Sequence, residues 1–196
     1  MIDERLKKQI EFMLEVDKLK NIYRQTYVLG ENRKENDAEH SWHITLLAFL
    51  LSEYSNTPID VLKVMKMTLI HDIVEIDAGD TYCYDEEGYK TKAEREKKGA
   101  KRIFGLLPED QAQELYSLWR EFEDCVTDEA KFAAALDRLQ PLTLNYAKGG
   151  ISWGEHGVYK EQVEKRNSSV AEASVQLAEL ISAIIDDAAD KGMLKR

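Results

Sequence analysis

Apolar residues recur at intervals of three and four along most of this 196-residue sequence, and only three prolines, at positions 58, 108 and 141, interrupt the pattern. This spacing places apolar side chains on one face of a helix, whereas a strand requires alternation at every second residue. No stretch of more than a few residues alternates in that way. The pattern therefore predicts an all-α fold. Because a chain of this length can bury one substantial core, we expect a single-domain helical bundle over residues 1–196.

The ends of the expected helices follow from capping residues, prolines and glycines. Segments 19–35 and 73–90 lack a helical period, so we expect an irregular basic stretch and an acidic surface loop there. In the third helix, Leu62 and Leu69 are expected to face the core. The last helix is amphipathic and stops at Gly192, so we expect it to close the bundle or to form a dimer contact. We expect helices over about residues 3–18, 37–54 with Asp37 as N-cap, 57–72 with Thr57 as cap, 91–104 and 169–191. Two further helices are expected to begin at Pro108 and near Thr127.

The sequence carries 27 basic and 37 acidic residues, a net charge of -10. Binding to a nucleic acid polymer requires a basic surface, so we expect no such partner, whereas a small anionic substrate needs only a few basic residues in a pocket. The first residues lack the order of a signal peptide, and the longest apolar run, 46–51, is too short to cross a membrane. Cys83 and Cys125 form no CxxC pair. We therefore expect a cytoplasmic protein with reduced thiols and no membrane contact.

One short stretch, residues 68–80, places His71, Asp72, Glu75, Asp77 and Asp80 directly after an apolar helical run. A His-Asp pair at the end of a buried helix is costly unless the two groups are paired, hydrogen-bonded or bound to a metal. The neighbouring carboxylates repel one another, and the simplest compensation is a cation among them.

Three further residues are candidates for the same site. His40 lies in the first turn of its helix with His43 three residues later, without the HExxH metal motif, so a hydrogen-bonded structural role is the alternative for a single histidine. Asp137 lies in a small, apolar helical stretch and needs a partner, for which a salt bridge to Arg138 or another basic residue is the alternative. Arg24, in the basic stretch, is either solvated or a contact for an anion.

Together, His40, His71, Asp72 and Asp137 offer two imidazoles and two carboxylates from three helices. Mixed nitrogen and oxygen ligands favour a divalent transition metal, Mn, Co, Fe, Ni or Zn, with Mg as an alternative. A metal that accepts six ligands would leave room for water and a substrate oxygen, and a bound metal lowers the pKa of water and neutralises a phosphoryl group. Hydrolysis of a phosphate ester is therefore accessible to this constellation.

The ordered pattern resembles the HD-domain superfamily of metal-dependent phosphohydrolases, in particular the small bacterial 5′-deoxynucleotidases and the HD-domain-containing protein 2-like proteins. The resemblance covers about residues 10–165. It rests on Glu39-His40-Ser41, His71-Asp72-Ile73-Val74-Glu75 with Gly79-Asp80, and Leu136-Asp137-Arg138-Leu139.

This resemblance implies a role for each matched position. His40, His71, Asp72 and Asp137 would hold the metal, and Asp72 and Glu75 would form the catalytic pair, with Glu75 moving the proton of the attacking water. Asp80 would recognise the sugar hydroxyl. Arg24 would contact the phosphate, although Gln25 stands where the nucleotidases carry an aromatic residue.

On this basis we expect a metal-dependent phosphomonoesterase acting on a small nucleotide, a deoxyribonucleoside 5′-monophosphate, and, as is common in the family, a homodimer. The alternatives are hydrolysis of a cyclic or pyrophosphate nucleotide, or a non-catalytic helical dimer that binds a metal or nucleotide. Neither the residues nor the resemblance assigns a role to Asp77, which we expect to face solvent or cap a helix, or to His43, His156 and the glycine-rich segment 149–157.

Overall fold

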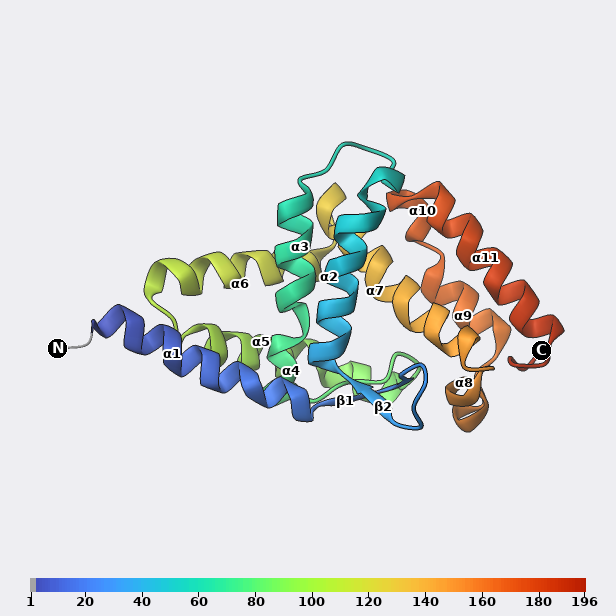
Figure 1. Cartoon of the computed structure of the whole chain (residues 1–196), viewed down its shortest axis with the longest axis horizontal. Helices are drawn as coiled ribbons and strands as arrows, with labels where there is room; N and C mark the ends of the chain where they lie inside the picture. Colours follow the sequence, from blue (N-terminus) through green and yellow to red (C-terminus); the bar gives the residue numbers. More distant parts are fainter. Residues whose placement is uncertain (1–2) are drawn as a thin grey trace.

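The computed structural model describes residues 3–196, and helices make up most of it (Figure 1). The all-α prediction is confirmed, with one small two-stranded antiparallel sheet added to the bundle. The helices are α1 (Glu4–Val16), α2 (Asp37–Leu51), α3 (Val61–Ile70), α4 (Glu75–Ala78), α5 (Glu86–Phe104), α6 (Glu109–Asp124), α7 (Asp128–Ala147), α8 (Ile151–His156), α9 (Lys160–Asn167), α10 (Val170–Ala173) and α11 (Val175–Asp190), and the strands are β1 (Tyr23–Tyr27) and β2 (Lys34–Asn36).

Helices α2 and α3 lie side by side at the centre and pack on α7, which runs behind them (Figure 1). On one side lie α1, α5 and α6, and on the other α9, α10 and α11, so that α1 and α11 are at opposite ends of the long axis. Helix α7 contacts α2, α3, α6, α9, α10 and α11. This central position explains why its sequence is rich in small and apolar residues.

Buried apolar side chains form two clusters. The larger one joins α2, α3, α7 and the C-terminal helices, and the smaller one lies between the end of α3, α5 and α6. Leu118 of α6 packs against both clusters. Trp119 and Phe122 of α6 are buried.

Several helix starts differ from the predictions because aspartate and asparagine side chains cap them elsewhere. Asn36, and not Asp37, is the N-cap of α2, where it forms a capping box with Glu39. Helix α3 begins after Asp60, whose side chain accepts a hydrogen bond from the backbone N–H of Lys63, so the start predicted at Thr57 is wrong.

Helix α5 begins at Glu86 and is capped by Asp85, five residues before the predicted start at Thr91. The acidic loop expected over 73–90 is correspondingly shorter and contains α4. The predicted end of α5 before Gly105 is confirmed, as is the cap of α7 at Thr127.

The C-terminal segment is two helices and not one, because Ser174 adopts extended backbone angles (φ -155°, ψ 115°) and its hydroxyl caps α11. Leu177, Ile181 and Ile185 of α11 enter the larger cluster. Helix α11 therefore packs this apolar face against the core. Gly192 follows with φ +72°, where glycine is favoured.

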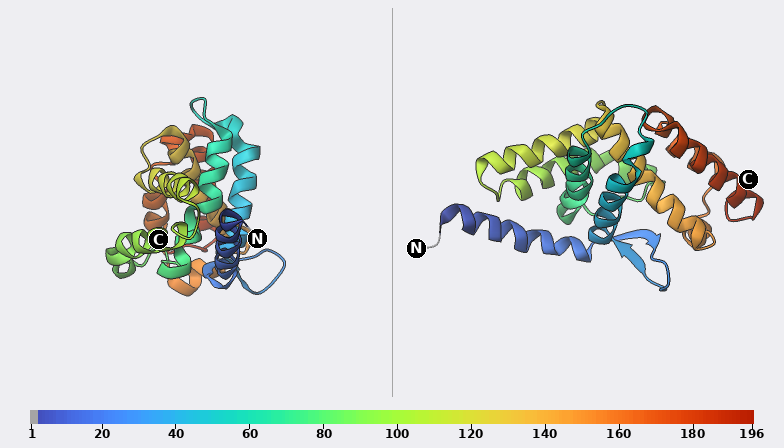
Figure 2. Two further views of the ribbon diagram at one scale, coloured as in Figure 1. Left: turned by 90° about the vertical axis from the view of Figure 1, so that its left-hand side faces the viewer. Right: turned by 45° about the horizontal axis from the view of Figure 1, so that its top comes forward.

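Residues 19–35, expected to be irregular, contain a short 3-10 helix and the β1–β2 hairpin, which projects from the bundle (Figure 2). Tyr23 pairs with Asn36 and Tyr27 with Lys34, so a register shift lies between the two pairs. Arg24 lies within this irregular part of β1. The hairpin leads directly into α2 and thereby brings Arg24 and His40 to the same end of the bundle.

Some apolar faces remain exposed. Leu62 and Leu69, expected in the core, are 63% and 53% exposed. Four apolar side chains of α1 are also exposed: Leu6, Ile10, Met13 and Leu14. Over residues 3–196, none of the helices has the length and apolarity needed to span a membrane.

Candidate metal centre and substrate pocket

The structure brings together the four residues that the sequence suggested as metal ligands. His40 comes from the first turn of α2, His71 and Asp72 from the 3-10 turn that follows α3, and Asp137 from the middle of α7. His40 Nε2 lies 3.0 Å from Asp137 Oδ1 and 3.9 Å from Asp72 Oδ2. His71 Nε2 lies 3.0 Å from Asp72 Oδ1 and 3.7 Å from Asp137 Oδ1. All four groups therefore converge on one small volume.

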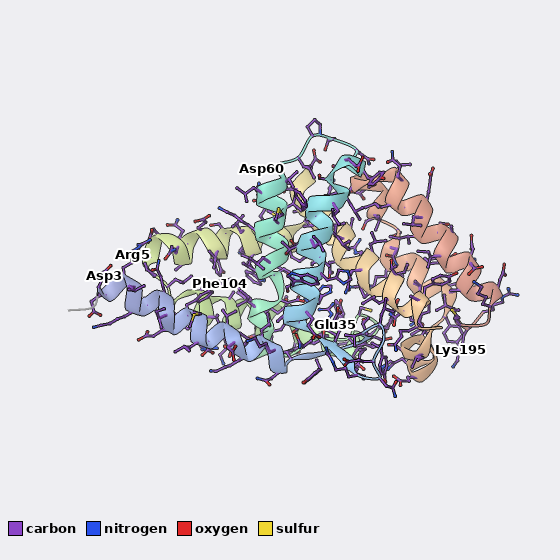
Figure 3. All side chains as sticks on the ribbon, in the orientation of Figure 1. Asp3, Arg5, Glu35, Asp60, Phe104 and Lys195 are labelled. Carbon is purple, nitrogen blue, oxygen red and sulfur yellow. The ribbon has the colours of Figure 1, made fainter. Side chains whose placement is uncertain are left out.

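The orientation of His40 is fixed by Gln140, one helical turn after Asp137. His40 is fully buried, and its Nδ1 lies 2.9 Å from Gln140 Oε1, an acceptor only. Nδ1 must therefore carry the proton and donate it to Gln140, which leaves the Nε2 lone pair facing the carboxylates. Gln140 is held in turn by Glu35, whose Oε1 accepts from Gln140 Nε2 at 2.7 Å, near the start of α2 (Figure 3).

His71 is fixed by its own helix. Its Nδ1 lies 2.9 Å from the carbonyl oxygen of Thr68, to which it donates, so Nε2 again faces the centre. Nε2 is buried and makes no hydrogen bond to any residue of the described chain. In both imidazoles, the N–H group on the outer side is hydrogen-bonded and the nitrogen on the inner side faces carboxylates. A metal ion requires this arrangement of its histidine ligands.

The distances fit such an ion. Ligand atoms that lie about 2.0–2.2 Å from a shared metal are separated from one another by roughly 3–3.5 Å. His40, His71 and Asp72 each offer an atom within 4.8 Å of the others, and Asp137 Oδ1 approaches both imidazoles. The residues present therefore fit a divalent cation.

The surroundings shift the pKa values of the two histidines in opposite directions. Burial acts to lower the pKa of His71, but the carboxylates of Asp72 and Asp137 outweigh burial and raise that pKa to about 10. Burial and the charge of Arg24 lower the pKa of His40. The nearby imidazoles hold the pKa of Asp137 well below its usual range despite burial. A proton on His71 and a divalent cation would thus compensate the same carboxylates.

Arg24 reaches this centre from β1. Its Nη1 donates to Asp72 Oδ2 at 2.7 Å and to Asp37 Oδ1 at 3.4 Å, and its Nη2 lies 3.8 Å from Asp137 Oδ1. Burial opposes its charge, but these carboxylates raise the pKa of Arg24 well above its ordinary value. The guanidinium therefore orients Asp72 and balances part of the negative charge of the site.

A second group of carboxylates lies beside the first. Asp37, Glu75 and Asp80 have oxygens within 4.8 Å of one another. Asp80 reaches this position because Gly79 ends α4 with φ +73°, a conformation that favours glycine, and turns the chain back. Burial and the neighbouring carboxylates raise the pKa of Glu75 well above its ordinary value and that of Asp37 to about 8. A carboxylate with a raised pKa is suited to accept a proton near neutral pH.

A cavity of about 240 Å³ opens onto these groups. Aromatic and amide side chains also line the cavity, a mixture that suits a small polar ligand with a planar ring. The lining includes Arg24, Gln25, Thr26, His71, Asp72, Glu75, Asp80, Tyr82, Cys83, Tyr84, Tyr89, Lys92, Asp137, Arg138, Asn145, Trp153, Arg166 and Asn167.

Other candidates from the sequence lie elsewhere. His43 Nδ1 lies 3.1 Å from Gln140 Nε2, so His43 supports the centre without facing it. Asp77 pairs with Arg102 of α5 and neither caps a helix nor enters the cavity. Arg138 donates to Ser169 and not to Asp137, so Arg138 is wrong as the alternative partner of Asp137, whereas two other basic residues, Arg24 and Arg166, lie 3.8 and 4.0 Å from it.

The segment 149–157 forms α8 and packs beside the hairpin. His156 Nε2 lies 3.1 Å from Gln25 Oε1, and its ring stacks on that of Tyr82 with centroids 4.3 Å apart. Trp153 is buried at the edge of the cavity. This segment therefore covers one wall of the cavity and contributes none of the four converging groups.

Three residues of the site were not identified from the sequence: Asp37, Gln140 and Arg166. Asp37 was taken for a helix cap, a position where aspartate is common. The sequence did contain an indication for Gln140, because Gln140 follows Asp137 by three residues and thus lies on the same helical face.

An all-α bundle with buried His and Asp groups converging from three helices defines a helical protein with a metal centre of the His/Asp type. A family model described as HD domain matches residues 16–178. The chain belongs to the HD-domain family.

Individual relatives agree with this assignment. A structure of a predicted metal-dependent phosphohydrolase from Magnetospirillum magnetotacticum is 48% identical, with a TM-score of 0.95 and all of both chains covered. Human 5′-deoxynucleotidase HDDC2 is 30% identical over 134 residues, which are 68% of this chain and 64% of the human protein. The Dictyostelium discoideum 5′-deoxynucleotidase HDDC2 is 28% identical over 70% of this chain and 75% of its own length. The aligned part is thus just under two thirds of the human relative.

Proposed function

We propose that this protein is a metal-dependent phosphomonoesterase that hydrolyses the 5′-phosphate of deoxyribonucleoside 5′-monophosphates. The observation that carries the proposal is the buried convergence of His40, His71, Asp72 and Asp137 beside a carboxylate, Glu75, whose pKa is raised. The names of the relatives that are 5′-deoxynucleotidases support the substrate class.

Two imidazoles and two carboxylates would hold the ion, and this donor set favours Mn, Co, Fe, Ni or Zn, with Mg as an alternative. When bound, such an ion lowers the pKa of water and neutralises negative charge on a phosphoryl group. The protein contributes orientation: Gln140 and the Thr68 carbonyl hold the imidazoles, and Arg24 holds Asp72.

Glu75 is the proton acceptor in this proposal. It lies directly after the turn that carries His71 and Asp72, is only 4% exposed, and its Oε2 makes no hydrogen bond within residues 3–196. Such a group is available to take the proton of a water that attacks phosphorus. Asp80, beside Glu75, is positioned to accept a hydrogen bond from a sugar hydroxyl, and Arg24 to stabilise the phosphoryl oxygens.

The proposal is tested by loading the purified protein with each candidate metal and measuring phosphate release from deoxyribonucleotides, ribonucleotides, cyclic nucleotides and pyrophosphates. We expect release from deoxyribonucleoside 5′-monophosphates. Release only from cyclic or pyrophosphate substrates would replace the substrate class, and release from none of them would refute an enzymatic role.

Variants separate the ligands from the proton acceptor. His71→Ala and Asp137→Ala should lose bound metal in elemental analysis, because each removes an inward-facing ligand. Glu75→Gln should keep the metal but lose turnover by about 10²–10⁴-fold, the usual contribution of a general base.

Asp77→Asn is the matched control for Glu75→Gln, since Asp77 lies two residues away and pairs with Arg102 on the surface. It should change turnover little. Full activity of Glu75→Gln would contradict the assigned role.

The oligomeric state, compartment and domain organisation are part of the same proposal. We infer a homodimer, because α1, α2 and α3 each expose large apolar side chains. We also infer a cytoplasmic protein that acts on small nucleotides and not on a nucleic acid polymer or at a membrane, since both cysteines are free thiols and the net charge is -10. A single domain is supported by α7, which contacts helices on both sides of the bundle.

A further inference from the structure

We propose that Arg166, on α9, is the second cationic contact, after Arg24, for the phosphate group of the ligand in this cavity, and that it adds hydrogen-bond donors where Arg24 is shared with three carboxylates. The assignment rests on the proposed function in placing a phosphate at the centre. It adds to the substrate site a residue of α9 that lies outside the three short sequence motifs around His40, His71-Asp72 and Asp137.

Arg166 is in the right place. It lines the same cavity as His71, Asp72 and Glu75, and its Nη2 lies 4.0 Å from Asp137 Oδ2. Its side chain is 27% exposed, compared with 13% for Arg24, so it retains a surface open to the cavity. Lys165, the adjacent residue of α9, is exposed.

The partners of the two arginines differ. Arg24 faces three carboxylates, Asp37, Asp72 and Asp137, within 2.7–3.8 Å. Among residues 3–196, Arg166 donates one hydrogen bond, from Nη1 to the hydroxyl of Tyr89 at 3.3 Å, and this partner is not a carboxylate. Within residues 3–196, its one acidic neighbour at 4.0 Å or less is Asp137.

Asp137 is an insufficient counterion for Arg166. Its Oδ1 already lies 3.0 Å from His40 Nε2 and 3.7 Å from His71 Nε2, and a metal held by these groups would share its negative charge. A largely buried guanidinium without a full counterion is costly. An anion in the cavity removes that cost.

Two other cationic side chains, Lys92 and Arg138, line the cavity, but neither lies within 4.0 Å of Asp72 or Asp137. Lys92 Nζ lies 2.6 Å from Glu96, which is 3% exposed, and Arg138 donates to the Ser169 hydroxyl. Among the described residues, Arg166 is therefore the guanidinium besides Arg24 that lies within 4.0 Å of a metal-centre carboxylate. A planar guanidinium binds two oxygens of a phosphate in parallel, which a lysine cannot do.

The ligand chemistry that this arrangement recognises is a phosphate dianion, either the terminal phosphate of a mononucleotide or inorganic phosphate. Such a dianion would meet the carboxylates of Asp72, Glu75, Asp80 and Asp137 in this cavity, so a second guanidinium beside the metal and Arg24 would lower the repulsion between them.

The test measures binding of inorganic phosphate to the Mn²⁺-loaded full-length protein by calorimetry, together with KM and kcat for deoxyribonucleoside 5′-monophosphates. Arg166→Met should weaken phosphate binding and raise KM by about 10- to 100-fold, as expected when a hydrogen bond to a charged group is lost. Metal content and thermal unfolding should stay as in the parent protein. Arg166→Lys should recover part of the affinity, since it restores charge without the planar fork.

Lys165→Met is the matched control, because it removes one positive charge from the adjacent, exposed position of α9. It should leave phosphate binding unchanged. Tyr89→Phe tests whether Arg166 acts only by holding Tyr89, and it should weaken phosphate binding less than Arg166→Met does.

Four results would overturn the assignment: phosphate affinity of Arg166→Met within twofold of the parent, metal loss in that variant, an equal effect of Lys165→Met, or an equal effect of Tyr89→Phe. The outcome is separable from the proposed function. If no nucleotide is hydrolysed but phosphate binding still depends on Arg166, the phosphate contact stands and the phosphomonoesterase proposal fails.

Discussion

At the scale of single residues, one buried amide organises the metal centre. Gln140 accepts from His40 Nδ1 through Oε1 and donates through Nε2 to Glu35, with His43 Nδ1 also within 3.1 Å. Gln140 is 2% exposed, so water cannot replace these partners. Because an amide oxygen can only accept, the network fixes which nitrogen of His40 is free to bind a metal.

Gln140→Met should therefore weaken metal binding while leaving all four ligands in place. Loss of a hydrogen-bond partner that orients a ligand typically costs about 10- to 100-fold in metal affinity. Competition with a fluorescent chelator measures that affinity. Leu139→Met, a substitution at the preceding buried position of α7, is the control and should retain it. Equal affinities for both variants would show that Gln140 does not control His40.

The sequence allowed the four converging residues to be predicted because each is a costly group on an otherwise apolar helix. His40, His71, Asp72 and Asp137 are brought together as expected, and Arg24 reaches them. Gln140 and Arg166 were missed for a physical reason. An amide or a guanidinium on a helix is unremarkable until tertiary packing shows which face is buried, and only packing turns Arg166 away from its exposed neighbours.

At the scale of elements, α5 shows that the length of an ion pair is a poor guide to its strength. Lys90 pairs with Glu87 and Lys92 with Glu96, both at 2.6 Å. The first pair is exposed, with 66% and 81% of the two side chains accessible, whereas Glu96 in the second pair is 3% exposed. Only the buried carboxylate of Glu96 depends on its lysine partner to compensate its charge.

Lys92→Met should destabilise the protein by about 2–3 kcal/mol, since removing one member of a buried pair strands the other charge, and Lys92 itself is partly accessible. Lys90→Met should change the free energy of unfolding by less than about 0.5 kcal/mol, as is usual for exposed pairs. Urea denaturation of both variants provides the comparison. Similar losses for the two would mean that burial of Glu96 does not set the strength of its pair.

Element types were easier to predict than element ends. The three- and four-residue period identified the long helices, because burial of an apolar face dominates their stability. Their starts at Asp60 and Asp85 were missed, since several capping residues compete in each loop and the choice depends on tertiary packing. The hairpin was missed because β1 and β2 are short and their register is shifted.

At the scale of the whole molecule, apolar stripes remain on the outer surface of α1 and α2. On α2 the stripe comprises Trp42, Leu46, Phe49 and Leu50, which are 39–66% exposed. Residues at positions i, i+4, i+7 and i+8 lie on one helical face. Leu6, Ile10, Met13 and Leu14 repeat the same spacing on α1. Over residues 3–196, the folded chain leaves both stripes exposed.

A second copy of the chain is the occupant that fits α2 in the homodimer we infer. A helical stripe of this kind can pair with itself across a twofold axis, where each copy buries the apolar face of the other. Helix α11, the other candidate for a dimer contact, has its main apolar face inside the bundle and exposes Val175 and Leu180. The self-association should therefore depend on α2 and not on α11.

Phe49→Glu should convert a dimer into a monomer of 22.6 kDa, because a charge at the middle of the stripe must be desolvated to form the interface. Light scattering coupled to size exclusion measures the mass directly. Leu180→Glu places the same charge on α11, where the side chain is 48% exposed, and should leave the dimer intact. Dissociation by Leu180→Glu alone would assign the interface to α11, and a monomeric parent protein would refute self-association through either helix.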